Sequence, residues 1–287
     1  MSSRAATVVA FGGNAMMRAG QAGTPAEQIA NARAACGPLV ERVARGDRLV
    51  LVHGNGPQVG VELAATGATL DVCVAATQGT MGYFLELALR DALRARGVEA
   101  RIATLATLVR VERDDPAFAA PDKPVGPVGA RRLVASPAPR EVLDLGAIAA
   151  LIDAGYLVIA GGGGGIPVVR GPGGDLAGVE AVIDKDRTAA LIGAALGARE
   201  LFDLTAIDVV YREFGTARAT PLPRLTVDEA RRLLAEGQFP PGSMGPKVEA
   251  ACAFLDAGGD SVLITAMDTL DAALRGDTGT RIDRRRT

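Results

Sequence analysis

The sequence predicts an α/β protein built around a mostly parallel β-sheet. Two observations predict it. Short apolar runs rich in Val, Leu and Ile alternate along the 287 residues with longer segments whose apolar residues recur every three or four positions, and several of the longer segments end in glycine. Strands that alternate with helices in this way form parallel sheets covered by helices on both faces. No repeat of fixed period and no low-complexity linker interrupts the pattern.

Each element is predicted from one of these two patterns. The expected strands are the short apolar runs at 6–11, 47–54, 99–109, 155–161, 199–205 and 260–266. The expected helices carry the helical spacing at 25–46, 82–97, 140–155, 185–198, 226–237 and 245–258. Residues 114–139 are rich in Pro and Gly and show neither period, so we expect there a loop or small excursion that acts as a lid or divides two lobes.

Composition excludes several classes of protein. The net charge of −2 gives no general attraction to nucleic acid or to an anionic membrane, and 48% hydrophobic residues exclude a disordered chain. Cys36, Cys73 and Cys252 lie far apart and form no metal or disulfide motif, which favours a reducing compartment. His53 is the single histidine, so a multi-histidine metal site is excluded. No signal-peptide pattern and no bilayer-length apolar run is evident, and we expect a cytoplasmic protein.

Clusters of glycine and small residues follow several of the predicted strands. They are FGGN after the first strand, HGNGPQVG (53–60) after the second, GGGGGIP (161–167) after the fourth, LTAIDVVY (204–211) at the fifth, and GSMGPK (242–247) before a helix. The carboxyl ends of parallel strands share one edge of a sheet, where ligands bind, and glycine lets backbone N–H groups approach an anion. Tight turns without a ligand would explain any single cluster; several together indicate an anion-binding crevice. The chain has neither the P-loop nor the dinucleotide-binding glycine motif at a strand end.

Three isolated lysines are the candidates to neutralise that anion. Lys123, Lys185 and Lys247 are the only lysines of the chain, and each lies in a loop flanked by glycine, proline or acidic residues. A lysine is a compact charge that can follow a moving phosphoryl group. Ordinary surface lysines remain the alternative. Asp184 and Asp186 flank Lys185, where they could orient lysines, help to coordinate a metal, or simply begin a helix.

Two further polar features permit both a structural and a functional interpretation. His53 precedes a glycine turn, so a hydrogen-bonded structural role is favoured over that of a base. The helical stretch 78–83, QGTMGY, either faces the crevice or uses its glycines for close helix packing.

Taken together, the motifs resemble one family. FGGNAMM, HGNGPQVG, LDVCVAATQG, DDPAFAAPDKPVGP, GGGGGIPV, GVEAVIDKD, GSMGPKV and GDTGTRI resemble the carbamate kinases of the amino acid kinase superfamily, in the family's order and over nearly the whole chain. The resemblance implies one amino acid kinase domain over 1–287, folded as a three-layer α/β/α sandwich and assembled as a homodimer. It implies the reaction carbamoyl phosphate + ADP ⇌ carbamate + ATP, with Mg²⁺. An N-terminal lobe (about 1–150) would bind the small acid and a C-terminal lobe (about 151–287) the nucleotide.

The resemblance also assigns roles by position. It implies a phosphoryl-binding turn at Gly12, Gly13 and Asn14 and a carbamate-binding turn at Gly54, Asn55 and Gly56. It implies a catalytic group made of Lys185, Lys247, Asp186 as the residue that orients the lysines, and Lys123 reaching in from the lid. It implies a nucleotide border made of Thr205, Asp208, Tyr211, Met244 and Pro246. No residue is assigned as a direct metal ligand.

The chain departs from the family pattern at two places. Only residues 128–134 separate VGP from ASP, where the family commonly has a longer lid. Ala206 and Val209 stand where the family commonly has Asp and Gly, beside the expected nucleotide. Two alternatives therefore stay open: a kinase of the same superfamily for another small carboxylate or phosphonate, and a non-catalytic ligand-binding relative.

Overall fold

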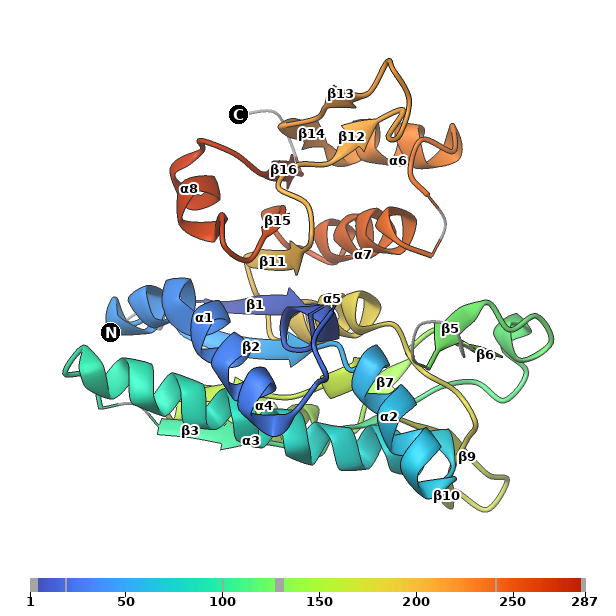
Figure 1. Ribbon diagram of the computed structural model, residues 1–287. Coiled ribbons are helices and arrows are strands. Elements are labelled where there is room, and N and C mark those ends of the chain that lie inside the picture. Colours follow the sequence, from blue (N-terminus) through green and yellow to red (C-terminus); the bar gives the residue numbers. More distant parts are fainter. Residues whose placement is uncertain (1–4, 19, 100, 127–131, 241, 285–287) are drawn as a thin grey trace.

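One large mixed sheet organises the protein. The computed structural model describes residues 5–18, 20–99, 101–126, 132–240 and 242–284 (Figure 1). The strand order in the large sheet is β14-β16-β15-β11-β1-β2-β8-β3. Its strands are β1 (Ala6–Phe11), β2 (Arg48–His53), β3 (Arg101–Thr104), β8 (Tyr156–Ile159), β11 (Glu200–Thr205), β14 (Arg224–Thr226), β15 (Ser261–Ala266) and β16 (Thr280–Asp283). The strands from β15 to β3 are parallel, and β16 runs antiparallel to β15.

Helices cover both faces of this sheet. They are α1 (Pro25–Ala44), α2 (Gly56–Thr66), α3 (Leu70–Ala95), α4 (Leu145–Asp153), α5 (Lys185–Ala195), α6 (Val227–Ala235), α7 (Met244–Asp256) and α8 (Leu270–Arg275). One apolar core joins the sheet to α1, α3 and α8, and a second joins its other face to α4, α5, α6 and α7. The predicted three-layer α/β/α class is therefore confirmed.

Alternation along the strands decides which residues enter which core. In β11, Leu201 belongs to the core beneath α5 and α7, whereas Phe202 and Leu204 belong to the core beneath α1 and α8. Successive side chains of a strand point to opposite faces, so Asp203 shares the face of Leu201. This places a carboxyl group between the sheet and the α5–α7 layer.

The smaller sheets lie beside the central one. A four-stranded sheet has the order β10-β9-β4-β7, and two hairpins pair β12 with β13 and β5 with β6. Their strands are β4 (Leu108–Arg110), β5 (Lys123–Val125), β6 (Arg132–Val134), β7 (Glu141–Val142), β9 (Ile166–Arg170), β10 (Leu176–Gly178), β12 (Tyr211–Arg212) and β13 (Thr220–Pro221). Three short 3-10 turns are η1 (Gly13–Ala15), η2 (Pro116–Phe118) and η3 (Gly162–Gly164).

The Pro- and Gly-rich excursion forms the β5–β6 hairpin, at the right of Figure 1. Val125 and Val134 of this hairpin are buried in a small core with Val59 of α2 and Val74 of α3. The part of the shortened lid that the structure describes is thus packed on α2 and α3. Residues 127–131 of the lid lie outside the described residues.

The element boundaries differ from the prediction at particular places. The run 99–109 is split into β3 and β4, and the run 53–60 is not only a turn, because α2 begins inside it at Gly56. Helix α3 begins at Leu70, eight residues before the helical stretch expected from 78, and α8 was not predicted. Figure 1 shows the elements from α6 to β16, in orange and red, gathered in the upper part of the molecule. The division of substrate and nucleotide between two lobes stays a prediction.

Helix α3 corrects one expectation of the sequence analysis. It is long and apolar enough to cross a membrane by length and composition, although no such run was expected. Met81, Leu85 and Leu89 on this helix are fully buried in the core that it shares with α1, and more than half of the apolar stretch is buried. Packing in the protein core explains its apolar character.

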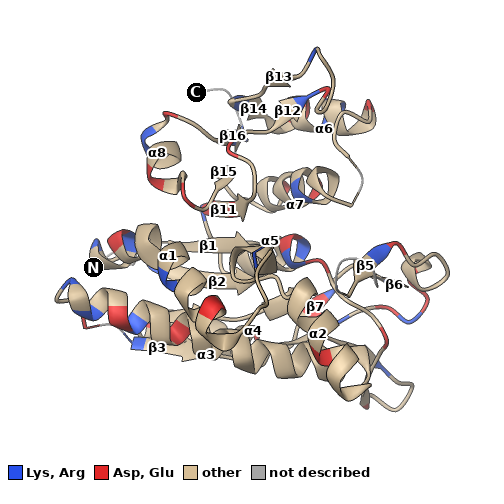
Figure 2. Ribbon diagram, viewed as in Figure 1, with Lys and Arg blue, Asp and Glu red and all other residues tan. Residues whose placement is uncertain are grey.

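Acidic and basic residues are interspersed over the helices in the view of Figure 2. Blue and red segments occur together on the same helices, and the net charge of the chain is −2. That the protein does not bind nucleic acid stays a prediction from the sequence.

Candidate active site

Helix N-termini converge at the carboxyl edge of the sheet. Turn η1 follows β1, α2 follows β2 after Gly54 and Asn55, and α5 and α7 begin with Lys185 and Met244. Turn η1 packs on α2, and α5 packs on both α7 and the glycine turn η3. Backbone N–H groups at helix N-termini lack intrahelical partners and carry partial positive charge, so this edge favours an anion.

A lysine–aspartate cluster lies at the same edge. The Lys247 Nζ atom is 3.0 Å from Oδ2 of Asp186 and 2.8 Å from Oδ1 of Asp203. The Lys185 ammonium forms an ion pair with Asp186 and is 3.9 Å from Oδ1 of Asp203. Both lysine side chains are only 12% exposed. The structure therefore brings together Lys185, Lys247 and Asp186, as the resemblance predicted.

Neighbouring charges and burial shift the pKa values of Lys247, Asp186 and Asp203 in this cluster. Burial lowers the pKa of Lys247, but the carboxylates of Asp186 and Asp203 outweigh burial and raise it above its ordinary value. Burial raises the pKa of Asp186, but the two ammonium groups outweigh burial and lower it. For Asp203, burial and repulsion from Asp186 prevail over the lysines, and its pKa is raised. Both lysine ammonium groups thus face carboxyl groups that stabilise their charge.

Asp203 is the member of the cluster that sequence reasoning missed. It lies inside the apolar run RELFDLT, which was interpreted only as a strand. The available signal was a carboxylate at an inward-facing strand position, because a buried carboxylate needs a partner.

Lys123 reaches the cluster from the β5–β6 hairpin. Its Nζ atom is 2.5 Å from Oδ2 of Asp184, and the other oxygen of Asp184 accepts a hydrogen bond of 2.9 Å from the Asp186 amide at the start of α5. Burial raises the pKa of Asp184, but Lys123 and Lys185 outweigh burial and lower it below its ordinary range. The Lys123–Asp184 pair connects the lid to the helix that carries Lys185.

The first two glycine turns lie against each other and against Lys185. A Cβ atom at Gly54 would be 3.0 Å from the Gly13 nitrogen and 3.0 Å from Cδ of Lys185. A Cβ atom at Gly13 would be 2.8 Å from Oε1 of Gln58 and 2.9 Å from the Gly54 oxygen. Gly12 is open on that side, and Asn14 is exposed. Glycine is required at positions 13 and 54 because backbone and a lysine stem approach them so closely.

Asn55 is held by the protein. It is 2% exposed and its Nδ2 donates a hydrogen bond of 2.9 Å to Oγ1 of Thr77. Gly163 has a φ of 68° and would strike the Asn55 side chain if it carried a Cβ atom. The Gly54 amide donates to the Phe11 carbonyl oxygen at 2.6 Å. In this turn the Gly54 amide and the Asn55 side chain are therefore already engaged by groups of the protein.

His53 and Gln78, for which the sequence left two interpretations open, are both bound to other groups of the protein. His53 is 1% exposed, its Nδ1 is 3.3 Å from the Gly54 oxygen, and burial lowers its pKa to about 4. It is therefore neutral near pH 7, as a structural histidine. Gln78 joins two loops, because its Oε1 accepts from the Thr107 amide at 2.8 Å and its Nε2 donates to the Gly162 oxygen at 2.7 Å.

The residues expected to border the nucleotide surround β11 and α7. Thr205 ends β11, and Met244 and Pro246 lie in the first turn of α7 just before Lys247. Asp208 is exposed and its carbonyl oxygen accepts from Oγ1 of Thr265 at 3.2 Å. Tyr211 lies on the β12–β13 hairpin, where its ring centroid is 6.1 Å from that of Phe214.

The departure from the family pattern at Ala206 and Val209 causes no strain. Val209 needs no glycine conformation, because Glu213 is the only non-glycine residue with positive φ in the described part of the chain. Ala206 is exposed, so the absence of a carboxylate at this position leaves no buried group without a counter-charge.

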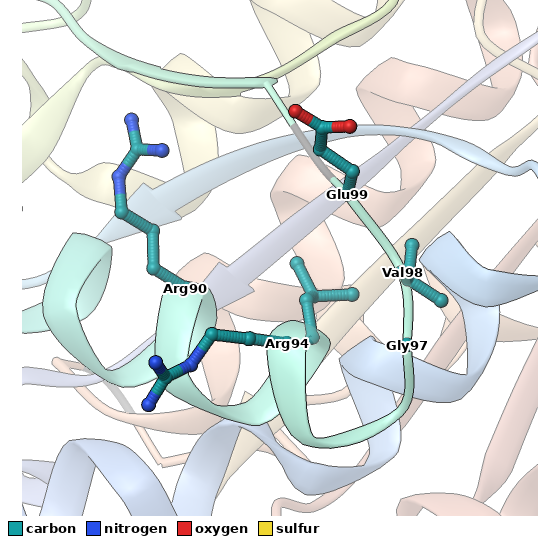
Figure 3. Close-up of a pocket in the computed structure, with 6 residues that line it drawn as sticks. Arg90, Arg94, Gly97, Val98 and Glu99 are labelled. Atoms are coloured by element: carbon teal, nitrogen blue, oxygen red, sulfur yellow. The ribbon is translucent and has the colours of Figure 1, made fainter.

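A separate hollow of about 360 Å³ lies far from the cluster (Figure 3). It is lined by Arg90, Leu93, Arg94, Gly97, Val98 and Glu99, where α3 ends and the chain leads into β3. This is the amino edge of the parallel strands, opposite the edge that carries the lysines. Its position gives it no part in the chemistry of the cluster.

Carboxylates available for a metal are few. Among the described residues, no group of three or more His, Cys, Asp or Glu side chains could hold a metal ion. Asp184, Asp186 and one oxygen of Asp203 are engaged by lysines. The described residues thus offer no ready-made protein cage for Mg²⁺, an ion that commonly binds through substrate phosphates.

Comparison with known proteins identifies the class. The model of the amino acid kinase family matches residues 5–266, and the chain belongs to this family. It is 39% identical to the carbamate kinase-like protein YahI of Escherichia coli and 38% identical to the carbamate kinase of Pyrococcus horikoshii, with 96% of this chain and 98% of each relative covered. The structure of Giardia lamblia carbamate kinase bound to AMP-PNP matches with a TM-score of 0.92 at 35% identity, covering 99% of both chains. The family resemblance predicted from the motifs is confirmed.

Proposed function

We propose that the protein is a phosphotransferase that moves a phosphoryl group reversibly between carbamoyl phosphate and ADP, giving carbamate and ATP. The observation that carries this proposal is the meeting of Gly13, Gly54, Lys185 and Lys247 at one edge of the sheet. Full-length similarity to carbamate kinases supports the same enzyme class. Phosphoryl transfer depends on positioning and charge neutralisation more than on covalent catalysis, and the site offers N–H groups and ammonium groups.

Each half of the site has a proposed substrate. The turns at Gly12, Gly13 and Asn14 and at Gly54, Asn55 and Gly56 would hold the transferring phosphoryl group and the carbamate. Lys185 and Lys247 would neutralise the phosphates, Asp186 would orient both lysines, and Lys123 would close the site from the hairpin. The close approach of Gly13, Gly54 and the Lys185 stem supports this arrangement, because the turns proposed to bind the acid and the phosphoryl group lie against a lysine proposed to bind phosphate.

The nucleotide would lie beside α7 and the end of β11. The Giardia lamblia carbamate kinase was solved bound to AMP-PNP, which supports use of ATP and ADP by a chain so similar in fold. Thr205, Asp208, Tyr211, Met244 and Pro246 are the proposed border. Mg²⁺ would be bound through the nucleotide phosphates and would neutralise part of their negative charge.

A homodimer in the cytoplasm is the proposed state of the protein. Val61, Val72 and Tyr83 are large apolar side chains on α2 and α3 that are each about half exposed, at 48%, 52% and 57%. Exposed apolar groups on adjacent helices support coverage by a second copy. The three cysteines are buried and unpaired, which supports a reducing compartment.

One observation favours a second candidate, a kinase for another small carboxylate or phosphonate. The short lid segment limits how far the hairpin can extend over the acid, and lid closure commonly excludes water from such sites. A non-catalytic relative is less well supported, because the lysine cluster is intact.

A substrate panel tests the proposal. ATP formed from Mg-ADP would be measured in a coupled luminescent assay with fresh carbamoyl phosphate, acetyl phosphate and other acyl phosphates at matched concentrations. We expect carbamoyl phosphate to be the preferred donor. Faster turnover with a different acyl phosphate would replace carbamate as the assigned substrate, and no turnover with any donor in folded protein would favour the non-catalytic alternative.

A further inference from the structure

Asp203 is an ionisable residue in the middle of a buried parallel sheet. It is 3% exposed and is aligned with Ala10 of β1 and Ile264 of β15, both uncharged. Its side chain faces the layer formed by α5 and α7, where the charged groups that act on it are Lys185, Asp186 and Lys247. A carboxyl group in such a place destabilises the fold unless its partners compensate, so its contacts should reveal what it does.

Those contacts hold Lys247 from a second direction. The Lys247 ammonium donates to Asp186 on α5 at 3.0 Å and to Asp203 on β11 at 2.8 Å. An ammonium group has three donors, so two are engaged by the protein and one is left for a ligand. With Asp186 alone, the flexible lysine side chain could rotate about a single contact. The contact with Asp203 restricts that rotation and thereby the direction of the remaining N–H.

The charge of the cluster constrains the protonation of Asp203. If all four groups are ionised, Lys185 and Lys247 are cancelled by Asp186 and Asp203, and the cluster offers no net charge to a polyphosphate. Burial and repulsion from Asp186 already favour the neutral form of Asp203. Its Oδ2 atom is buried and has no hydrogen-bond partner among the described residues. A neutral Asp203 keeps Oδ1 as an acceptor for Lys247 and gives the cluster one positive charge.

We propose that Asp203 is a further positioning residue of the phosphoryl-transfer site, holding Lys247 from the sheet side, and that it is a neutral acid while nucleotide phosphates are bound. The inference rests on the proposed nucleotide site. Arrival of ADP then draws a proton from solvent onto Asp203 whenever the unliganded protein has lost it. Asp186 remains the charged partner of both lysines.

Proton uptake on ADP binding tests the protonation directly. ADP without added metal would be titrated calorimetrically into the full chain between pH 6 and 9, in pairs of buffers with different ionisation enthalpies. We expect the wild type to take up more protons than Asp203→Asn, with a difference that rises with pH toward one proton. The titration of ADP itself is common to both proteins and cancels. Asp260→Asn, an exposed aspartate at the amino edge of the sheet, serves as the matched control and should behave as the wild type.

The outcomes separate the two proposals. Equal proton uptake by wild type and Asp203→Asn up to pH 9, with ADP bound by both, would overturn the uptake of a proton by Asp203 on ADP binding, while leaving the proposed function intact. No ADP binding by folded wild type would count against the nucleotide site itself, and the inference would fall with it.

A kinetic comparison tests the positioning role. Asp203→Asn keeps an oxygen acceptor for Lys247, whereas Asp203→Leu fills the same space without one. Loss of a hydrogen bond to a charged group corresponds to roughly a tenfold or larger fall in rate. We expect kcat of the Asn variant to stay within about threefold of wild type and kcat of the Leu variant to fall about tenfold or more. Full activity of folded Asp203→Leu, or equal losses in both variants, would overturn the inference.

Discussion

A single methyl group at Gly54 should slow catalysis while leaving the protein folded. The Cβ atom of Gly54→Ala would lie 3.0 Å from both the Gly13 nitrogen and the Lys185 Cδ atom. A Cβ atom seldom makes contacts as close as 3.0 Å, so one or both neighbours must give by a few tenths of an ångström. Overpacking of this size costs about 1–3 kcal/mol, which a large core tolerates.

The same displacement acts directly on the proposed chemistry. A misplacement near 1 Å in an active site can cost about 100-fold in rate, so a shift of a few tenths of an ångström in Gly54→Ala is expected to lower kcat by roughly three- to tenfold. The assay is ATP formation from Mg-ADP and carbamoyl phosphate, with the melting temperature measured in parallel.

A matched control separates crowding from the general effect of the substitution. Gly79→Ala adds the same methyl group on α3, where nothing lies within 4 Å, and should retain wild-type activity. Wild-type kcat in folded Gly54→Ala would refute the claim that the two glycine turns and Lys185 form one tightly packed site. An equal loss in Gly79→Ala would refute it as well.

Three other predictions concern buried polar groups. Asn55→Ala should raise KM for carbamoyl phosphate more than KM for ADP, because the Asn55 amide, held by Thr77, belongs to the acid-binding turn; an equal rise in both would contradict that assignment. The pKa of His53 is lowered from 6.5 to about 4 by burial, so the free energy of unfolding should fall by at most about 3 kcal/mol as the pH drops through this range. Unfolding in denaturant should show a smaller fall in the free energy of unfolding for His53→Gln, because glutamine does not titrate in this range of pH. Burial raises the pKa of Cys36 to about 12 and of Cys252 to about 11. A thiol reagent at pH 8 should therefore label both cysteines much more slowly in native than in denatured protein. Rapid labelling of the native protein would contradict their burial.

The sequence predicts the fold well where local pattern and tertiary role agree. The buried strands of the large parallel sheet are continuous apolar runs, and the runs at 6–11, 199–205 and 260–266 match β1, β11 and β15 closely. Helix α2 was missed because it begins with Gly56-Pro57, a pair that predicts a turn, although Pro is well suited to the first turn of a helix. The early start of α3 was missed because its first turns, LDVCVAATQG, lie partly against the lid hairpin rather than on a simple amphipathic stripe.

Part of the candidate site can be predicted, because rare residue types mark it in the sequence. Lysines are rare in this chain, so Lys123, Lys185 and Lys247 stand out, and the structure places all three near carboxylates. Their mutual proximity depends on the parallel register of strands far apart in the sequence. Asp203 shows the limit, since a strand pattern does not reveal which inward-facing residue meets a lysine of another helix. The close packing of Gly54 on Lys185 likewise becomes visible only in three dimensions.

The central claim is that the cluster around Lys247 neutralises the phosphates of a nucleotide during transfer from carbamoyl phosphate. The most direct test compares wild type with Lys247→Ala in the formation of ATP from Mg-ADP and fresh carbamoyl phosphate, with circular dichroism to establish that both are folded. We predict ready ATP formation by the wild type and a loss of at least about 100-fold in the variant, as expected when a charge that stabilises the transition state is removed. Comparable ATP formation by both folded proteins would contradict the assigned role of the cluster.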